Sequence, residues 1–433
     1  MHIIQQLVFI LITAIASYIF AKKAGEIRRN ILLGKEEDLN DMPSERWKNV
    51  LLLALGQKKM FQRPVPAVLH LFVYGGFLLI NIEIVEILID GICGTERIFQ
   101  GYLGGIYTFA IGFFEVLAVL TLVAVIAFLI RRNVMKIKRF NMSELQGFPR
   151  KDANTILFIE IVLMSMLLLM NAAEGAAKNE GFFISNHLTF LFSGMDENTL
   201  HLIQRTCWWG HIIGIFAFLN YLPYSKHFHI ILAFPNAYYM RLKPQGEMSN
   251  MKEIQNEVLY MMQPELAPTT TGEQTAPQRF GAKDVMDLSW KNLLDAYSCT
   301  ECGRCTSNCP ANITGKKLSP RKIMMDTRDR LEEVGANINL NLNKSFVDDG
   351  KSLIHDYITV EELRACTTCQ ACVEACPVGI EPLSIINQLR RYLIMEESNA
   401  PQEWNMMSGN IENNMAPWKF SPDDRDQWMN EMN

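Results

Sequence analysis

The sequence predicts an all-α protein in which a five-helix transmembrane bundle is followed by a helical domain that lies in water. The first observation is charge: residues 1–235 carry 21 Lys and Arg against 18 Asp and Glu (+3), residues 236–433 carry 20 against 28 (−8), and the two sum to −5. The second is pattern, because long apolar segments recur in the first part while helical periodicity without strand alternation follows. A composition of 49% apolar and 20% charged residues excludes a disordered chain. A slightly negative net charge excludes a typical nucleic-acid binder.

Five apolar segments are long enough to cross the hydrocarbon core of a membrane, which is about 30 Å thick and needs about 20 helical residues. The first segment is followed, not preceded, by basic residues, Lys22 and Lys23. Because this is the reverse of a secretory signal, we expect the segment to remain as an anchor. The predicted helices lie near residues 3–21, 65–89, 106–130, 153–172 and 206–234.

The loops between these segments differ in charge. Residues 22–64 carry ten Lys and Arg, and residues 131–152 carry seven. Of the two loops on the opposite side, one holds only Arg97 and the other holds only Lys178 and Arg205. By the positive-inside rule the basic loops face the cytoplasm. The N-terminus is then outside, and the chain leaves the fifth helix on the cytoplasmic side.

The chain after the membrane bundle, residues 1–235, divides into three parts. Residues 236–284 contain several prolines and a Thr-rich run and are expected to form a linker. Residues 285–397 show helical patterns and are expected to form a compact domain. The tail, residues 398–433, is polar but holds large apolar anchors such as Trp418, which suit partner docking. A frayed terminus is the alternative.

Eight of the ten cysteines lie in two short runs of identical spacing, Cys-x-x-Cys-x-x-Cys-x-x-x-Cys-Pro. Thiolates at this spacing bind three corners of a four-iron cubane from one tight turn. The runs therefore predict two [4Fe-4S] clusters and a reducing compartment. Nothing near them suggests a nucleophile, a general base pair or a phosphate-binding loop, so we expect no catalytic residue there. The runs are Cys299, Cys302, Cys305 and Cys309, and Cys366, Cys369, Cys372 and Cys376.

The fourth ligand of each cluster comes from the other run. In two-cluster ferredoxins the cysteine before Pro ligates the other cluster, so Cys376 and Cys309 exchange places. Two structural zinc sites are the alternative, and the doubled spacing favours iron-sulfur. The predicted ligands are Cys299, Cys302, Cys305 and Cys376 for the first cluster, and Cys366, Cys369, Cys372 and Cys309 for the second.

Residues 285–397 resemble the helical ferredoxin module of the heterodisulfide reductase small iron-sulfur subunit, which is similar to the C-terminal half of the succinate dehydrogenase iron-sulfur subunit. The likeness rests on the two cysteine runs with helical segments between them. It implies an α-helical ferredoxin domain with two clusters and leaves the substrate open.

Histidines fall in the predicted second and fifth helices. His211 and His229 are 18 residues apart, which is five whole helical turns, so they would share one helix face about 27 Å apart in height. His229 would then meet His70, at the start of helix two, near the cytoplasmic surface. Ionisable groups in a membrane are costly unless they have a function, so this pair suits haem ligation. The alternative is that these histidines reach the lipid headgroups. We favour it for His227, which would lie about 160° around the helix from the face of His211 and His229.

The histidine spacing resembles the haem b subunit of respiratory nitrate reductase, a five-helix protein with two histidines on helix two and two on helix five. Residues 222–229, Leu-Pro-Tyr-Ser-Lys-His-Phe-His, followed by Pro235, look like the end of that fifth helix. The resemblance implies that residues 1–235 form a haem b membrane domain, in which His70 and His229 bind one haem b on the cytoplasmic side. It also implies that His211 binds one side of an outer haem.

The second haem is left open by one departure from that family. Its second histidine on helix two corresponds to Ile80 in this chain. The outer haem is therefore missing, or His211 is joined by another ligand such as His201 or Met170, or His211 lines a quinone pocket.

Carboxylates also fall within the predicted helices. Glu83 and Glu86 lie one turn apart in the outer half of helix two, and Glu115 lies in the outer part of helix three. Quinol oxidation releases protons, which a buried carboxylate can carry, so these three are candidates for a quinone or proton site. The alternative is that Glu83 and Glu86 reach water at the headgroups. Cys93 and Cys207 are expected as two thiols on the outer side, with a disulfide as the alternative.

Together these features predict a membrane subunit of a quinone-linked oxidoreductase in a respiratory chain. It would relay electrons between menaquinone or another quinone, haem b and two [4Fe-4S] clusters. The combination resembles the heterodisulfide-reductase-like menaquinone oxidoreductases of bacteria. That resemblance implies a multi-pass protein of the bacterial inner membrane, with the ferredoxin domain and the C-terminus in the cytoplasm.

A partner is expected because a cysteine-rich domain with a CCG motif performs the terminal chemistry in that wider family, and no cysteine follows Cys376 here. The expected partner is a CCG-domain iron-sulfur subunit or a protein like electron-transferring flavoprotein. Two other functions are open. The chain could be a non-catalytic anchor for a ferredoxin module, or an iron-sulfur redox sensor.

Overall fold

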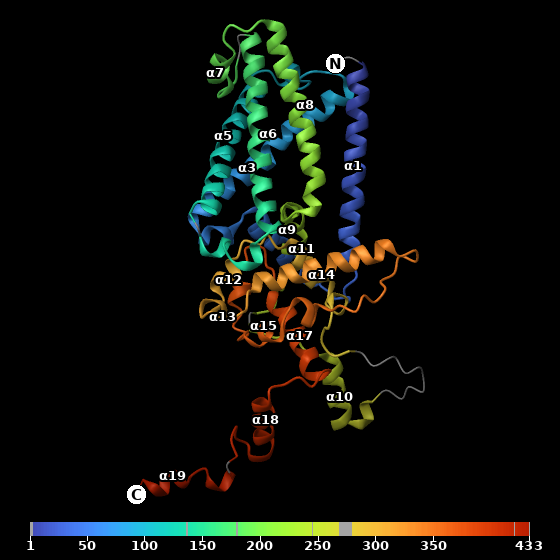
Figure 1. Cartoon of the computed structure of the whole chain (residues 1–433), viewed down its shortest axis with the longest axis vertical. Coiled ribbons are helices and arrows are strands. Elements are labelled where there is room, and N and C mark those ends of the chain that lie inside the picture. The colour runs from blue at the N-terminus through green and yellow to red at the C-terminus, as the bar shows by residue number, and fades with distance from the viewer. Residues whose placement is uncertain are drawn as a thin grey trace.

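The computed structural model describes residues 3–135, 137–178, 181–244, 246–267, 279–419 and 421–432. Over these residues the protein is all-α, as predicted, and the only bridges between extended segments are two isolated ones. Figure 1 shows a bundle of long helices, a group of shorter helices packed at one end of it, and a C-terminal tail that projects away from both. The helices are α1 (Ile3–Ile31), α2 (Pro43–Asn49), α3 (Pro64–Cys93), α4 (Gln100–Leu103), α5 (Gly105–Asn133), α6 (Phe148–Lys178), α7 (Ser185–Leu188), α8 (Glu197–Tyr221), α9 (His229–Tyr238), α10 (Lys252–Met262), α11 (Trp290–Ser298), α12 (Arg304–Asn308), α13 (Pro310–Ile313), α14 (Pro320–Leu340), α15 (Val360–Arg364), α16 (Ala371–Glu374), α17 (Pro382–Met395), α18 (Gln402–Asn414) and α19 (Gln427–Glu431).

Four helices in the described part of the chain, α1, α3, α5 and α6, are long and apolar enough to cross a membrane. They contain between 29 and 31 residues each, so their length exceeds the thickness of a hydrocarbon core of about 30 Å. Large apolar side chains on their outer faces are exposed, among them Ile82, Phe109 and Phe158, each more than half exposed. These helices correspond to the first four predicted spans.

The fifth predicted span, residues 206–234, is wrong. α8 ends at Tyr221, and the chain makes two short 3-10 turns before it resumes as α9. Pro223, in the first of these turns, has no backbone N–H with which to continue an α-helix. α8 runs alongside α6 (Figure 1) but is not among the helices that are apolar enough to span. His211 and His229 therefore lie on two different helices, and the expectation that they share one helix face is wrong.

α8 packs closely against α6 because small residues face that helix. A Cβ atom added at Gly210 would lie 2.9 Å from the Met166 side chain, and one added at Gly214 would lie 2.8 Å from the Leu163 side chain. Residues four apart lie on one helix face, and such small residues let two helices in a membrane approach closely. This contact fixes the depth of His211, which lies between the two glycines.

The C-terminal helical region, residues 281–397, packs directly on one end of the bundle. α1 continues to Ile31 and contacts α11 and α14. Asn30 donates a hydrogen bond to the Tyr297 hydroxyl at 3.0 Å. A Cβ atom at Gly335 would overlap the Asn30 side chain, so α14 meets α1 at a glycine. The two parts of the molecule therefore share a close-packed interface.

α9 carries the chain across the domain boundary that the sequence places at residue 235. Asn236 is fully buried, donates a hydrogen bond to the Val378 carbonyl oxygen at 3.0 Å and accepts one from Lys291 at 3.1 Å. The predicted linker, residues 236–284, thus begins inside a packed helix, and α10 forms within it. Its Thr-rich run falls in residues 268–278, outside the described residues.

The tail contains two helices, α18 and α19, that project away from the rest of the protein (Figure 1). No described side chain of either helix is buried. Trp404, Trp418 and Trp428 are between 46% and 63% exposed. The tail therefore presents large apolar side chains without covering them.

Candidate electron-transfer site

The two cysteine runs fold into matching loops. Two residues after the first cysteine of each run the backbone is left-handed, at Glu301 (φ 55°) and Thr368 (φ 57°). It is left-handed again four residues after it, at Gly303 (φ 70°) and Gln370 (φ 61°). Non-glycine residues rarely adopt this conformation without a function for it. Each loop then leads into a short helix, α12 or α16, and these two helices pack on each other.

Backbone N–H groups donate to two cysteine sulfurs of the second run. The Thr368 amide donates to Cys366 Sγ at 3.4 Å, and the Ile380 amide donates to Cys376 Sγ at 3.4 Å. Amide donors of this kind stabilise a ligating thiolate and tune a cluster. The second run therefore supplies amide donors to two of its sulfurs.

The eight sulfurs fall into two sets, each with a member of the other run. Cys305 interacts electrostatically with Cys299, Cys302 and Cys376, and least with Cys372. Both Cys366 and Cys372 interact with Cys369 and with Cys309. The cysteine that precedes Pro in each run thus lies near leading cysteines of the other run.

Burial keeps several of these thiols protonated when no metal is bound. It raises the pKa of Cys299 to about 12 and that of Cys376 to about 11. It likewise raises the pKa of Cys372 to about 12. Metal ligation deprotonates a thiol, so cluster assembly here must release protons.

A cavity of about 350 Å³ separates the bundle from the first cysteine loop; we call it the interface cavity. Its volume lies in the range of small-molecule and cofactor sites. Apolar side chains from α3, α5 and α6 line it on one side, and Cys302 and its neighbour Thr300 line it on the other. His70, His227 and His229 all line the same cavity.

Hydrogen bonds orient two of these imidazoles. His70 Nδ1 lies 3.0 Å from Gln57 Oε1, and His229 Nδ1 lies 3.1 Å from the Lys226 carbonyl oxygen. Both bonds leave Nε2 for another partner. Proteins fix a metal-ligating imidazole through a hydrogen bond at the ring nitrogen that does not bind the metal. His70 and His229 are also close enough to interact electrostatically. The sequence predicts this pair.

The expectation that His227 points away from this pair is wrong. The rings of His227 and His229 are 5.4 Å apart and nearly perpendicular. The reason is the break after α8: both residues lie at the end of a 3-10 turn and the start of α9, where a rotation computed for one continuous helix does not apply.

An ionic network joins the bundle to the first cysteine loop. Glu301, in that loop, accepts hydrogen bonds from Lys226 and from Arg328, the latter at 2.9 Å. Burial on its own raises the pKa of the Glu301 carboxyl, but the two cations outweigh it, and the pKa lies below its ordinary value. Asp152 lies 3.7 Å from Lys226 and completes the network.

His211 lies elsewhere in the bundle. It is 1% exposed, its Nδ1 is 3.0 Å from the Leu163 carbonyl oxygen, and its Nε2 has no hydrogen-bond partner among the described residues. Ile80 is buried. His201 is exposed, and Met170 lines a separate pocket at the far end of the bundle.

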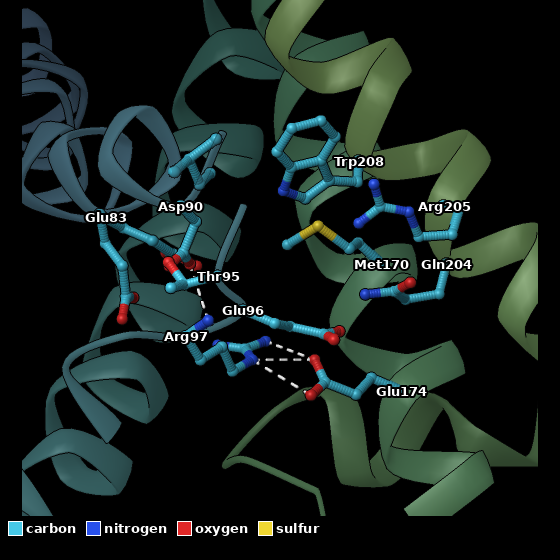
Figure 2. A pocket seen from close by; sticks show the side chains of 12 residues that line it. Glu83, Asp90, Thr95, Glu96, Arg97, Met170, Glu174, Gln204, Arg205 and Trp208 are labelled. Atoms are coloured by element: carbon cyan, nitrogen blue, oxygen red, sulfur yellow. Dashed lines mark hydrogen bonds and ion pairs between the residues drawn. The ribbon is translucent and has the colours of Figure 1, made fainter. Parts of the chain in front are cut away.

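That far-end pocket, of about 30 Å³, is shown in Figure 2. Arg97 and Glu174 lie side by side at its edge and form an ion pair at 2.6 Å. Glu83 and Gln204 lie on opposite sides of it, and Glu83 Oε2 and Gln204 Oε1 have no hydrogen-bond partner within the described ranges. A pocket of this size holds about one water molecule.

The other two predicted carboxylates have structural partners. Glu86 accepts hydrogen bonds from the Tyr107 hydroxyl at 2.7 Å and the Phe99 amide at 3.0 Å. Glu115 accepts hydrogen bonds from Asn171 at 3.0 Å and from the amides of residues 184 and 185 at 2.8 and 3.0 Å. All three carboxylates are buried, so the alternative that Glu83 and Glu86 reach headgroup water is wrong. Cys93 and Cys207 are free thiols.

Residues 298–380 match the family model of the 4Fe-4S dicluster domain. The cysteine runs therefore belong to a two-cluster iron-sulfur domain, and the homologues of the chain are iron-sulfur oxidoreductases. The resemblance to heterodisulfide reductase iron-sulfur subunits is confirmed, whereas none of these matches is to a haem b subunit of nitrate reductase.

Three relatives illustrate this. The chain is 28% identical to "Probable iron-sulfur-binding oxidoreductase FadF" of Bacillus subtilis over 99% of its own length and 61% of the relative. It is 26% identical to "EtfAB:quinone oxidoreductase" of Syntrophomonas wolfei over 92% and 56%, respectively. It is 34% identical to one subunit of the ferredoxin/F(420)H(2)-dependent CoB-CoM heterodisulfide reductase of Methanosarcina acetivorans over 28% and 60%. The chain thus spans about three fifths of the first two relatives, and no solved structure matches it.

Several residues around the site are not predicted by sequence patterns. Gln57 and Lys226 orient the imidazoles through contacts made by a loop and by a turn, which periodicity does not predict. Glu301 carries no signal in the sequence, because the second cysteine run also contains a glutamate, Glu374.

Proposed function

We propose that this chain is the membrane electron-transfer subunit of a quinone-linked oxidoreductase complex. It relays electrons between menaquinone or another quinone, haem b and two [4Fe-4S] clusters, to or from a soluble partner. The observation that carries the proposal is the interface cavity, because His70 and His229 from the bundle line the same cavity as Cys302. A one-electron carrier held there lies between the membrane and the first cluster.

The residues around the interface cavity fit a haem. His70 and His229 would be its ligands, since both Nε2 atoms are left over by the hydrogen bonds at Nδ1. When bound, haem b supplies a one-electron carrier whose potential depends on its axial ligands. Gln57 and the Lys226 carbonyl would hold the two rings in one orientation. His211, with its unpartnered Nε2, remains a candidate ligand for a second haem or a quinone.

The clusters would be held as the sulfur grouping indicates. We assign Cys299, Cys302, Cys305 and Cys376 to the first cluster and Cys366, Cys369, Cys372 and Cys309 to the second. The first lies next to the interface cavity, so the second is the one that a soluble partner would meet.

Proton release at the quinone would use Glu83. Of the three candidate carboxylates, Glu86 and Glu115 are held by several donors, whereas Glu83 keeps an unpartnered oxygen beside a pocket that fits one water. The pocket lies at the end of the bundle far from the clusters. Glu83→Gln should abolish proton release coupled to quinol oxidation in liposomes and leave the clusters intact.

The partner would be a CCG-domain iron-sulfur subunit or a flavoprotein. The name of the Syntrophomonas relative, which pairs EtfAB with a quinone, supports the flavoprotein. The tail, residues 398–433, offers exposed tryptophans for docking it. We place the clusters and the tail in the bacterial cytoplasm, because the basic loops lie at that end of the bundle.

A reduced-minus-oxidised absorbance spectrum of the full chain, purified in mild detergent, tests the haem assignment. We expect a low-spin haem b spectrum that disappears in His70→Ala and in His229→Ala, with the cluster signals in electron paramagnetic resonance (EPR) unchanged. His201→Ala, at an exposed position, is the matched control and should keep the spectrum. A wild-type protein without a Soret band would contradict the proposal.

A further inference from the structure

The interface cavity has a cationic rim on one side. Arg131, Arg132, Arg139, Arg304 and Lys226 line it, whereas Glu160 is the acidic residue among its lining. Asp152 contacts Lys226 at the rim. Glu160 follows Asp152 by eight residues on α6, so Glu160 lies about 12 Å deeper in the bundle. Just outside this lining, Glu301 and Asp152 act electrostatically on Arg132, and Glu301 also binds Lys226.

Two of these cations donate to acceptors within the protein. Arg304 donates to the carbonyl oxygens of Lys59 at 3.0 Å and Met60 at 3.3 Å. Lys226 donates to the Pro149 carbonyl oxygen at 2.7 Å and to Glu301. Both side chains are therefore already held in place without a ligand in the cavity.

Arg132 and Arg139 differ from them. Arg132 Nε, Arg139 Nε and Arg139 Nη1 are buried and have no hydrogen-bond partner among the residues that the structure describes. Both guanidinium groups lie over the Phe140 ring, at 5.3 and 4.7 Å from its centre, which holds them in place. Buried donors without a partner are costly, so this arrangement suits an acceptor that comes from a ligand.

We propose that Arg132 and Arg139 bind the anionic end of an amphipathic ligand whose apolar body fills the interface cavity. We identify this anionic end with the two propionate carboxylates of haem b, and this identification rests on the proposed function. Guanidinium groups bind carboxylates and phosphates alike, so the phosphate of an anionic lipid is the other source of the same chemistry. Arg132 and Arg139 would then hold the haem carboxylates.

The test uses the full chain in mild detergent, with Arg132→Gln, Arg139→Gln, the double variant, and Lys138→Gln as the matched control. Lys138 is an exposed cation next to Arg139 and has no buried donor. Unchanged EPR signals of both clusters show that each variant is folded. The readouts are the rate of haem transfer to excess apomyoglobin and the phospholipid retained after purification, measured by mass spectrometry.

Loss of hydrogen bonds to a charged group should speed haem transfer about tenfold or more in the double variant, with no change in Lys138→Gln. Haem that leaves the double variant at the wild-type rate would overturn the proposal. A wild-type protein without haem, but with a bound phospholipid that the double variant loses, would uphold the anion site and reject the haem assignment. A wild-type protein that retains neither would overturn it as well.

Discussion

Replacing Glu301 by Gln should loosen the first cluster selectively. The carboxylate is 3% exposed and lies between Lys226 and Arg328, whose side chains are 9% and 17% exposed. At 2.9 Å, and at an effective dielectric constant of about 20, the attraction between Glu301 and Arg328 alone is about 6 kcal/mol before desolvation is counted. Removing one partner of a buried ion pair costs about 3–5 kcal/mol in measured cases.

The lower end of that range applies here because each cation keeps another carboxylate. Asp152 lies 3.7 Å from Lys226, and Asp329 lies 3.5 Å from Arg328. We therefore expect a loss of about 3 kcal/mol in the free energy that holds the loop closed over its cluster, which is a factor of about 150 in the population of the open loop.

The assay is anaerobic iron chelation, with EPR to follow each cluster separately. In Glu301→Gln the first cluster should lose iron about 150 times faster than in the wild type, while the second should lose it at the wild-type rate. Glu374→Gln is the matched control: this glutamate also lies in a cysteine run, but its side chain is 54% exposed. Equal loss rates in Glu301→Gln and the wild type, or equal damage to both clusters, would refute the reasoning.

Four further substitutions test other parts of the structure. Cys309→Ser should abolish the EPR signal of the second cluster and spare the first, and loss confined to the first would reject the exchange of ligands. Gly335→Ala should cost about 1–3 kcal/mol in the free energy of unfolding, because its Cβ would overlap the Asn30 side chain. Gly409→Ala, with open space around it, should be neutral or slightly stabilising in the same thermal melt. Glu115→Gln should lower stability by about 1.5–3 kcal/mol through weaker bonds to its three donors, and an unchanged melting temperature would contradict its structural role.

Local patterns in the sequence suffice for much of the architecture. Apolar stretches predict α1, α3, α5 and α6, because a helix that faces lipid must be apolar over about 20 residues. The cysteine spacing predicts the dicluster domain, because the ligand geometry of a cubane depends on residues that are adjacent in sequence.

The errors concern features that depend on packing. The continuous fifth helix fails at Pro223, because the chain there turns to pack on the C-terminal helical region. A continuous helix through that turn would place His227 on another face than His229, but the two rings are neighbours. The roles of Glu86 and Glu115 follow from donors on distant segments, which no local pattern contains.

The most direct test of the account is electron transfer from the clusters to quinone in liposomes. The full chain is incorporated, its clusters are reduced with a stoichiometric amount of dithionite, menaquinone is added, and the EPR signals of the clusters are followed by freeze-quench. The account predicts rapid reoxidation in the wild type and none in His229→Ala, whose clusters dithionite still reduces. Equal reoxidation rates in the two proteins would contradict it.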